Sequence, residues 1–177
     1  LFFSRALRDL KNVARAVIDH RRHPAKRCPI LGDDPHADQI IAYVKEQGLQ
    51  VEWILETHVH ADHLTAAQYL KQQIGGKTAM SERISLVQET FSSIYNINIK
   101  QFNAFQTFDH VFQDHEKFHI GNLQAYNIPT PGHTPACLSY VIGDAVFVGD
   151  TLFMPDYGTA RCDFPKGSAE TLFDSVQ

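Results

Sequence analysis

The hydrophobic and polar positions of this chain follow two periods, which predict helices alternating with strands. Apolar residues recur every three or four positions in several segments, the spacing of a helix with one buried face. Others gather in short runs rich in β-branched and aromatic side chains and bounded by Gly, Asn or Asp, which is typical of strands. We expect helices over 37–47, 64–74 and 84–94, strands over 51–56, 77–80, 137–142 and 145–149, and a hairpin over 118–123. The alternation predicts a mixed α/β sandwich.

The first 33 residues depart from this alternation. Residues 1–18 place apolar side chains between arginines and a lysine with the spacing of an amphipathic helix. An organelle-targeting stretch has the same character, but Asp9 and the lack of an initiating Met favour ordinary structure or the end of a fragment. We therefore expect an atypical N-terminal segment over 1–33 and one domain over 34–177.

Composition and charge exclude several classes of partner. The chain has 177 residues, 44% of them hydrophobic, and a net charge of −4, so nothing indicates nucleic acid. No apolar run approaches the ~20 residues that span a bilayer. Cys28, Cys137 and Cys162 form no Cys-x-x-Cys pair, which argues against a disulfide framework and a thiolate zinc site. We expect a cytoplasmic protein without membrane partners. The sequence leaves open whether it forms a homodimer.

The densest chemistry of the chain directly follows the expected strand over 51–56. His58, His60, Asp62 and His63 fall within six positions, and imidazole and carboxylate are ligands that transition metals prefer. In extended backbone His58 and His60 project to the same side, so their nitrogens can converge on one ion. A lone histidine would indicate only a polar turn; this pattern at a strand end predicts a metal site.

Two later segments offer further ligands. His133 lies in a loop over 129–135 that prolines make rigid, and Gly132 beside it permits close backbone approach. Asp150 ends the apolar run 145–149; alone it would indicate a turn, but beside two other metal-type segments it is better explained as a ligand. The candidate metal ligands are thus His58, His60, His133 and Asp150. We expect the aromatic-rich stretch 102–112 to border the site.

These motifs carry a resemblance. His58-x-His60-x-Asp62-His63, then 130–134 (TPGHT), then 148–152 (VGDTL), resemble in this order the metallo-β-lactamase superfamily. Residues 153–165, FMPDYGTARCDFP, resemble the persulfide dioxygenases and most closely their bacterial β-lactamase hydrolase-like branch. The resemblance covers about 34–177 and implies the αββα sandwich of that superfamily.

The resemblance also implies an activity and a cofactor. It implies one Fe(II) per chain, held by His58, His133 and Asp150. The implied activity is the oxidation of glutathione persulfide, or a similar small persulfide, by O2 to sulfite and thiol. His60, Asp62 and His63 then orient ligands and hold water, and Asp62 and His63 are the candidate catalytic residues. Arg161 and Tyr157 are the candidate substrate-binding residues; for Arg161 an ordinary ion pair with Asp163, holding the loop beneath the site, is equally expected.

The sequence departs from the family at both ends, which keeps two alternatives open. The N-terminal segment does not match the usual opening strands, and the sequence stops before a segment whose histidine completes a second metal site in the hydrolases. We therefore expect a domain incomplete at its C-terminus. The alternatives are a dinuclear zinc hydrolase of the glyoxalase II type acting on a glutathione thioester, and a non-catalytic metal-binding fragment. Lys166 stands where this branch usually has glycine.

Overall fold

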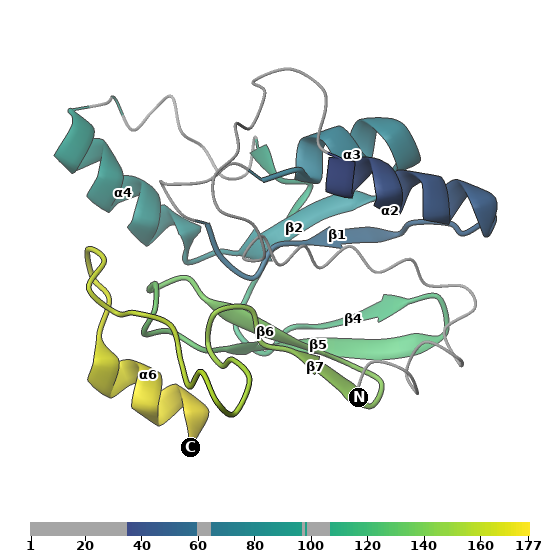
Figure 1. Cartoon of the computed structure of the whole chain (residues 1–177). Helices are drawn as coiled ribbons and strands as arrows, with labels where there is room; N and C mark the ends of the chain where they lie inside the picture. The colour runs from purple at the N-terminus through teal and green to yellow at the C-terminus, as the bar shows by residue number, and fades with distance from the viewer. Residues whose placement is uncertain (1–34, 60–64, 97, 99–106) are drawn as a thin grey trace.

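The computed structural model describes residues 35–59, 65–96, 98 and 107–177, which form two facing β-sheets between layers of helix (Figure 1). The first sheet is parallel, in the order β1 (Trp53–Leu55), β2 (Lys77–Ser81), β3 (His110–Phe112). The second is antiparallel, in the order β4 (Lys117–Ile120), β5 (Leu123–Pro129), β6 (Leu138–Ile142), β7 (Ala145–Phe147). The expected N-terminal segment 1–33 lies outside the described residues.

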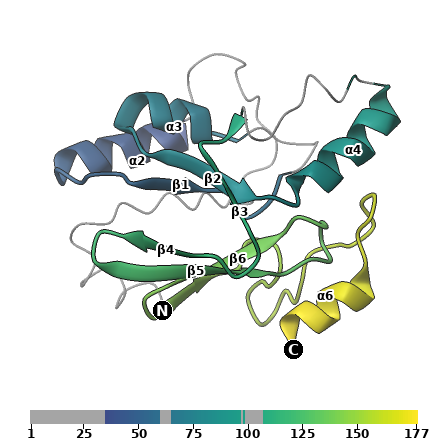
Figure 2. The ribbon, with the colours of Figure 1, turned by 180° about the vertical axis from the view of Figure 1, so that it is seen from behind.

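Helices flank the sandwich on both sides. Helices α2 (Pro35–Glu46) and α3 (Ala67–Ile74) lie over the outer face of the first sheet, with α4 (Ile84–Tyr95) beyond its end; α6 (Ala169–Val176) lies at the opposite side of the molecule (Figures 1 and 2). This agrees with the mixed α/β sandwich that the sequence pattern predicts and with the αββα order that the resemblance implies. None of the described helices is long and apolar enough to cross a membrane.

The core lies between the two sheets, and each sheet contributes alternate residues to it. Phe112 of β3 and Tyr140 of β6 are fully buried, with ring centroids 5.8 Å apart, and Phe118 of β4 packs on both rings. Aromatic side chains of this size contribute a large share of the apolar area that a core buries. Phe112 itself therefore belongs to a core strand and not to the border of the site. Phe108 and Val111 pack in one cluster with Val59, beside His58, and for the rest of the stretch the expected border stays a prediction.

The turns explain why the strand predictions succeed. The β4–β5 hairpin turns on Gly121 and Asn122, with Gly121 at a φ of +56° and Ile120 paired with Leu123. A glycine with positive φ at the first central position suits the type II′ turns that match strand twist. The helix over 64–74 likewise ends at Gly75, whose amide bonds the carbonyl of Lys71, and in the described residues it begins at Ala67. The start of α3 is therefore later than the hydrophobic pattern indicates.

Two features of the C-terminal part escaped prediction. Helix α6 begins at a Ser168 cap, whose hydroxyl accepts a hydrogen bond from the Thr171 amide at 3.2 Å. The sequence carried this signal, but the helix is only 8 residues long. Lys166 has a φ of +63°, in the left-handed region that side chains disfavour, so the glycine that the resemblance implies at this position would fit the backbone better.

Candidate metal centre

His58 is placed by the end of β1, where the chain leaves the first sheet and contacts the second. The Leu138 amide donates to the Thr57 carbonyl at 2.9 Å, and the Tyr140 hydroxyl donates to the Glu56 carbonyl at 2.9 Å. Both donors are residues of β6: Leu138 begins the strand, and Tyr140 is one of its buried residues. These bonds attach the segment before His58 to the sheet that carries the other candidate ligands.

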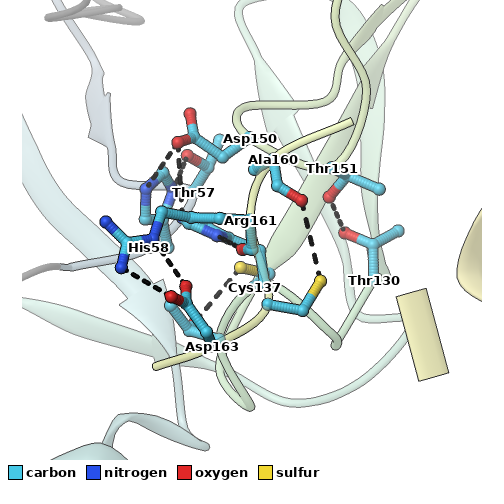
Figure 3. A network of polar contacts seen from close by, with 12 residues as sticks. Thr57, His58, Thr130, Cys137, Asp150, Thr151, Ala160, Arg161 and Asp163 are labelled. Carbon is cyan, nitrogen blue, oxygen red and sulfur yellow. Dashed lines mark hydrogen bonds and ion pairs between the residues drawn. The ribbon is translucent and has the colours of Figure 1, made fainter. Parts of the chain in front are cut away.

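The loops after β5 and β7 deliver the other two ligands. His133 lies between β5 and β6 and Asp150 follows β7, so both project from neighbouring parts of the second sheet. A buried chain of hydroxyls joins the two loops. Thr151 donates to Thr130 at 2.9 Å (Figure 3), and the Thr130 and Ser139 oxygens lie 3.1 Å apart. The positions of His133 and Asp150 are therefore coupled through the protein interior.

The structure brings three of the four predicted metal ligands together. Nε2 of His133 lies 3.3 Å from Oδ2 of Asp150, and Nε2 of His58 lies 3.7 Å from the same oxygen (Figure 3). One ligand atom from each of the three residues lies within 4.8 Å of the others. The side chains are 9%, 3% and 14% exposed for His58, His133 and Asp150, so the cluster is partly shielded from water. Grouped donors of this kind suit a single metal ion.

Both imidazoles point Nε2 inward because oxygen atoms engage the other nitrogen. Nδ1 of His133 lies 2.6 Å from the carbonyl oxygen of Arg161, which can only accept, so Nδ1 carries the hydrogen and Nε2 has the lone pair. Nδ1 of His58 lies 3.0 Å from the Thr57 hydroxyl. Metal-binding histidines in proteins are oriented by such partners. The donor set thus fits a borderline divalent ion such as Fe(II) or Zn(II).

Gly149 makes the approach of Asp150 to His58 sterically allowed. Its φ is +54°, and a Cβ added there would lie 2.4 Å from Oγ1 of Thr57, the hydroxyl that contacts His58. No real Cβ tolerates that distance, so any side chain at 149 would separate the β7 loop from the end of β1. The glycine before Asp150 therefore has a steric role that the sequence reading did not assign.

Breaking the hydroxyl chain should loosen the centre without removing a ligand. We expect Thr151→Val to lower the free energy of unfolding by about 1 kcal/mol, the usual loss for one buried hydrogen bond, and to weaken metal binding severalfold. Urea denaturation of the metal-free protein and a chelator-competition titration measure the two effects. Thr90→Val is the matched control, since its hydroxyl donates to the Leu86 carbonyl within α4, a bond remote from the site in the chain. Equal effects from both variants would contradict the coupling.

The remaining predicted site residues have different outcomes. His60, Asp62 and His63 lie outside the described residues, so their roles stay predictions. Tyr157 is 77% exposed in a turn after Asp150. The Arg161 side chain pairs with Asp163, through Nε at 2.5 Å and Nη2 at 2.7 Å from the two carboxylate oxygens. This is the ion pair that the sequence left open beside substrate binding.

Neither described cysteine is placed to act as a thiolate. Burial raises the pKa of the Cys137 thiol to about 11, with an opposing hydrogen bond from Thr134. Burial, and then the neighbouring Asp163 charge, also raise the pKa of Cys162 above its usual value. Because both pKa values are raised, both thiols stay protonated near neutral pH. Thiolate is the form that binds metals or attacks substrates, so neither cysteine is a candidate for these roles.

Fold and site together define a metal-binding αββα domain, and comparison with known families assigns it. The chain belongs to the metallo-beta-lactamase superfamily, whose family model matches residues 31–177. The resemblance that the three sequence motifs carry is thereby confirmed. The family supports a metal at this centre, and the identity of the ion is open.

Individual relatives of this chain carry different names. The chain is 58% identical over 143 residues to "Glyoxylase B2" of Dictyostelium discoideum, covering 80% of this chain and 49% of that protein. It is 51% identical to a "Beta-lactamase hydrolase-like protein" of Xylella fastidiosa (86% and 38% covered). It is 31% identical to human "Persulfide dioxygenase ETHE1, mitochondrial" (84% and 50% covered).

A solved structure shows the same fold. The crystal structure of ETHE1 from Myxococcus xanthus superposes with a TM-score of 0.62 at 29% identity, covering 80% of this chain and 53% of that chain. The present chain spans half or less of the length of these curated relatives.

Proposed function

We propose that this protein is an Fe(II)-dependent enzyme that oxidises a small persulfide, of which glutathione persulfide is the best candidate, to sulfite and the thiol. The observation that carries the proposal is the set of two imidazole Nε2 atoms and one carboxylate within 4.8 Å of one another. Two histidines and one carboxylate on one face of an ion are associated with non-haem Fe(II) oxygen chemistry, because other coordination positions stay open. Similarity to the human persulfide dioxygenase supports the same assignment.

The residues of this chain supply binding and orientation. His58, His133 and Asp150 would hold the ion, and the carboxylate would offset part of its charge in a site shielded from water. The Thr57 hydroxyl and the Arg161 carbonyl fix the ring orientations of the two histidines. Bound iron supplies the affinity for sulfur and dioxygen and the redox chemistry. The protein thus sets geometry and access.

The overall reaction balances with water as the third reactant. One persulfide, one O2 and one water give one thiol and one sulfurous acid, which ionises to sulfite. The persulfide loses four electrons and dioxygen takes them, with the sulfur–sulfur bond broken and the thiol carrier released. No further oxidant or reductant is needed.

A zinc hydrolase acting on a glutathione thioester is the second candidate. It is favoured by the higher identity to "Glyoxylase B2" than to the persulfide dioxygenase. A dinuclear hydrolase requires a second metal position, for which Asp62 and His63 are the predicted ligands. The two candidates therefore differ in metal stoichiometry as well as in substrate.

Metal content and oxygen uptake separate the two candidates. For protein purified without oxygen and loaded with Fe(II), we expect one iron per chain, O2 uptake on adding glutathione persulfide, and one sulfite formed per O2. The zinc-loaded protein is the control and should consume no O2. Two zinc ions per chain with turnover of a glutathione thioester and no O2 uptake would replace the dioxygenase with the hydrolase.

A further inference from the structure

The carbonyl of Arg161 selects the form of His133 that binds metal. A neutral imidazole carries one hydrogen, on either Nδ1 or Nε2, and only the nitrogen without it can coordinate an ion. With Nδ1 2.6 Å from that carbonyl, hydrogen on Nδ1 is stabilised and Nε2 is left to face Asp150. The position of one peptide group therefore decides whether His133 presents a lone pair to the site.

Interactions of the Arg161 side chain hold this peptide group. The guanidinium binds Asp163 at two points, 2.5 and 2.7 Å, which ties together both ends of the short segment 161–163 (Figure 3). Its Cζ also lies over the Phe164 ring, 4.7 Å from the centroid. A planar, two-point contact of this kind fixes geometry in a way that a lysine cannot.

Phe164 extends the same arrangement to the ring of His133. The two rings meet edge to face, with centroids 5.6 Å apart and an interplanar angle of 86°. His133 is thus held at Nδ1 by the backbone of residue 161 and beside its ring by residue 164. We name Arg161, Asp163 and Phe164 the 161–164 clamp.

The geometry points to Arg161 as a positioning residue for the metal centre: through the 161–164 clamp it fixes the hydrogen of His133 on Nδ1. Asp163 occupies its Nε and Nη2 and Phe164 one of its faces, which favours positioning over substrate binding. The inference rests on the metal-binding part of the proposed function and not on the reaction. The Arg161–Asp163 pair is 65% exposed on each side, so it contributes little to folding.

The test measures metal affinity and the hydrogen position directly. We expect Arg161→Gln and Asp163→Ala each to weaken Zn(II) binding severalfold. The loss should be smaller than the ~10–100-fold that removing an outer partner of a ligand costs, because the carbonyl that contacts His133 remains and only its support is lost. The double variant should lose no more than either single one, because the two side chains act as one unit. Nitrogen NMR of the metal-free protein should show hydrogen on Nδ1 of His133 in the wild type and a mixture of the two forms in the variants.

An ion pair outside the 161–164 clamp provides the matched control. Arg83→Gln removes the pair with Asp114, whose side chains are 34% and 31% exposed, and should leave zinc affinity and the His133 signal unchanged. Melting temperatures of all variants should stay within a few degrees of the wild type, since exposed pairs contribute little. Wild-type zinc affinity in Arg161→Gln with a raised KM alone would assign Arg161 to substrate and overturn the inference. Failure of O2 uptake in the wild type would leave these metal measurements interpretable.

Discussion

Asp150→Ala is expected to abolish metal binding and with it all activity. The carboxylate is the sole anionic group of the three-residue cluster, and its Oδ2 is the atom that both imidazoles approach, at 3.3 and 3.7 Å. Without it a doubly charged ion would meet two neutral rings in a partly buried site, with no charge to offset its lost hydration. The affinity should fall by more than the ~10–100-fold that loss of an outer partner costs. Competition with a chromophoric chelator, followed by O2 uptake, measures both losses.

Asp144→Ala is the control for this variant. Asp144 is exposed in the turn between β6 and β7, six positions before Asp150, which lies in the loop after β7. Its removal changes the net charge by the same amount and should leave metal affinity intact. Tight one-to-one binding by Asp150→Ala, with circular dichroism showing native structure, would mean that a different carboxylate, such as Asp62, completes the site.

The sequence predicts the ligands better than it predicts their support. His58, His133 and Asp150 were predicted as ligands from three motifs taken together and from the family resemblance, since Asp150 alone would indicate a turn. The Arg161 carbonyl is a backbone atom that every residue possesses, and nothing in the sequence signals that it orients His133. The Thr130–Thr151 bond joins residues 21 positions apart, a contact that only the tertiary fold creates.

The same contrast between local patterns and long-range contacts explains where the prediction of the fold was wrong. Strands bounded by glycine turns, such as the β4–β5 hairpin, were predicted because turn chemistry is local. Strand β3 was missed because its residues lie in an aromatic-rich stretch that was interpreted as a border of the site. Strands β1 and β7 also have 3 residues, but they lie within longer apolar runs that predict a strand. Phe112 reaches the core through pairing of β3 with β2, a relation between distant segments.

Gly132→Ala is expected to be the most destabilising single substitution considered, by about 3 kcal/mol. Gly132 has a φ of +139°, and an added Cβ would lie 2.4 Å from Cα and 2.5 Å from the amide nitrogen of Leu172 in α6. Backbone strain of this type costs about 1–3 kcal/mol, and displacing packed atoms costs a further 1–3 kcal/mol. The Ser168 amide donates to the Gly132 carbonyl at 2.8 Å, so separating α6 from the loop also breaks a hydrogen bond.

Gly143→Ala is the control that separates backbone strain from steric clash with neighbouring atoms. Gly143 has a φ of +60° with no atom within 4 Å of an added Cβ, so alanine there should cost only about 1–2 kcal/mol, the price of the left-handed conformation. Urea denaturation of the metal-free proteins compares the two variants, and zinc titration reports whether the neighbouring His133 has moved. Because α6 holds the His133 loop through Gly132 and Leu172, metal affinity should fall in Gly132→Ala alone. Equal free energies of unfolding for the two variants would show that α6 moves away from the added Cβ at no energetic cost. Its contact would then not position His133.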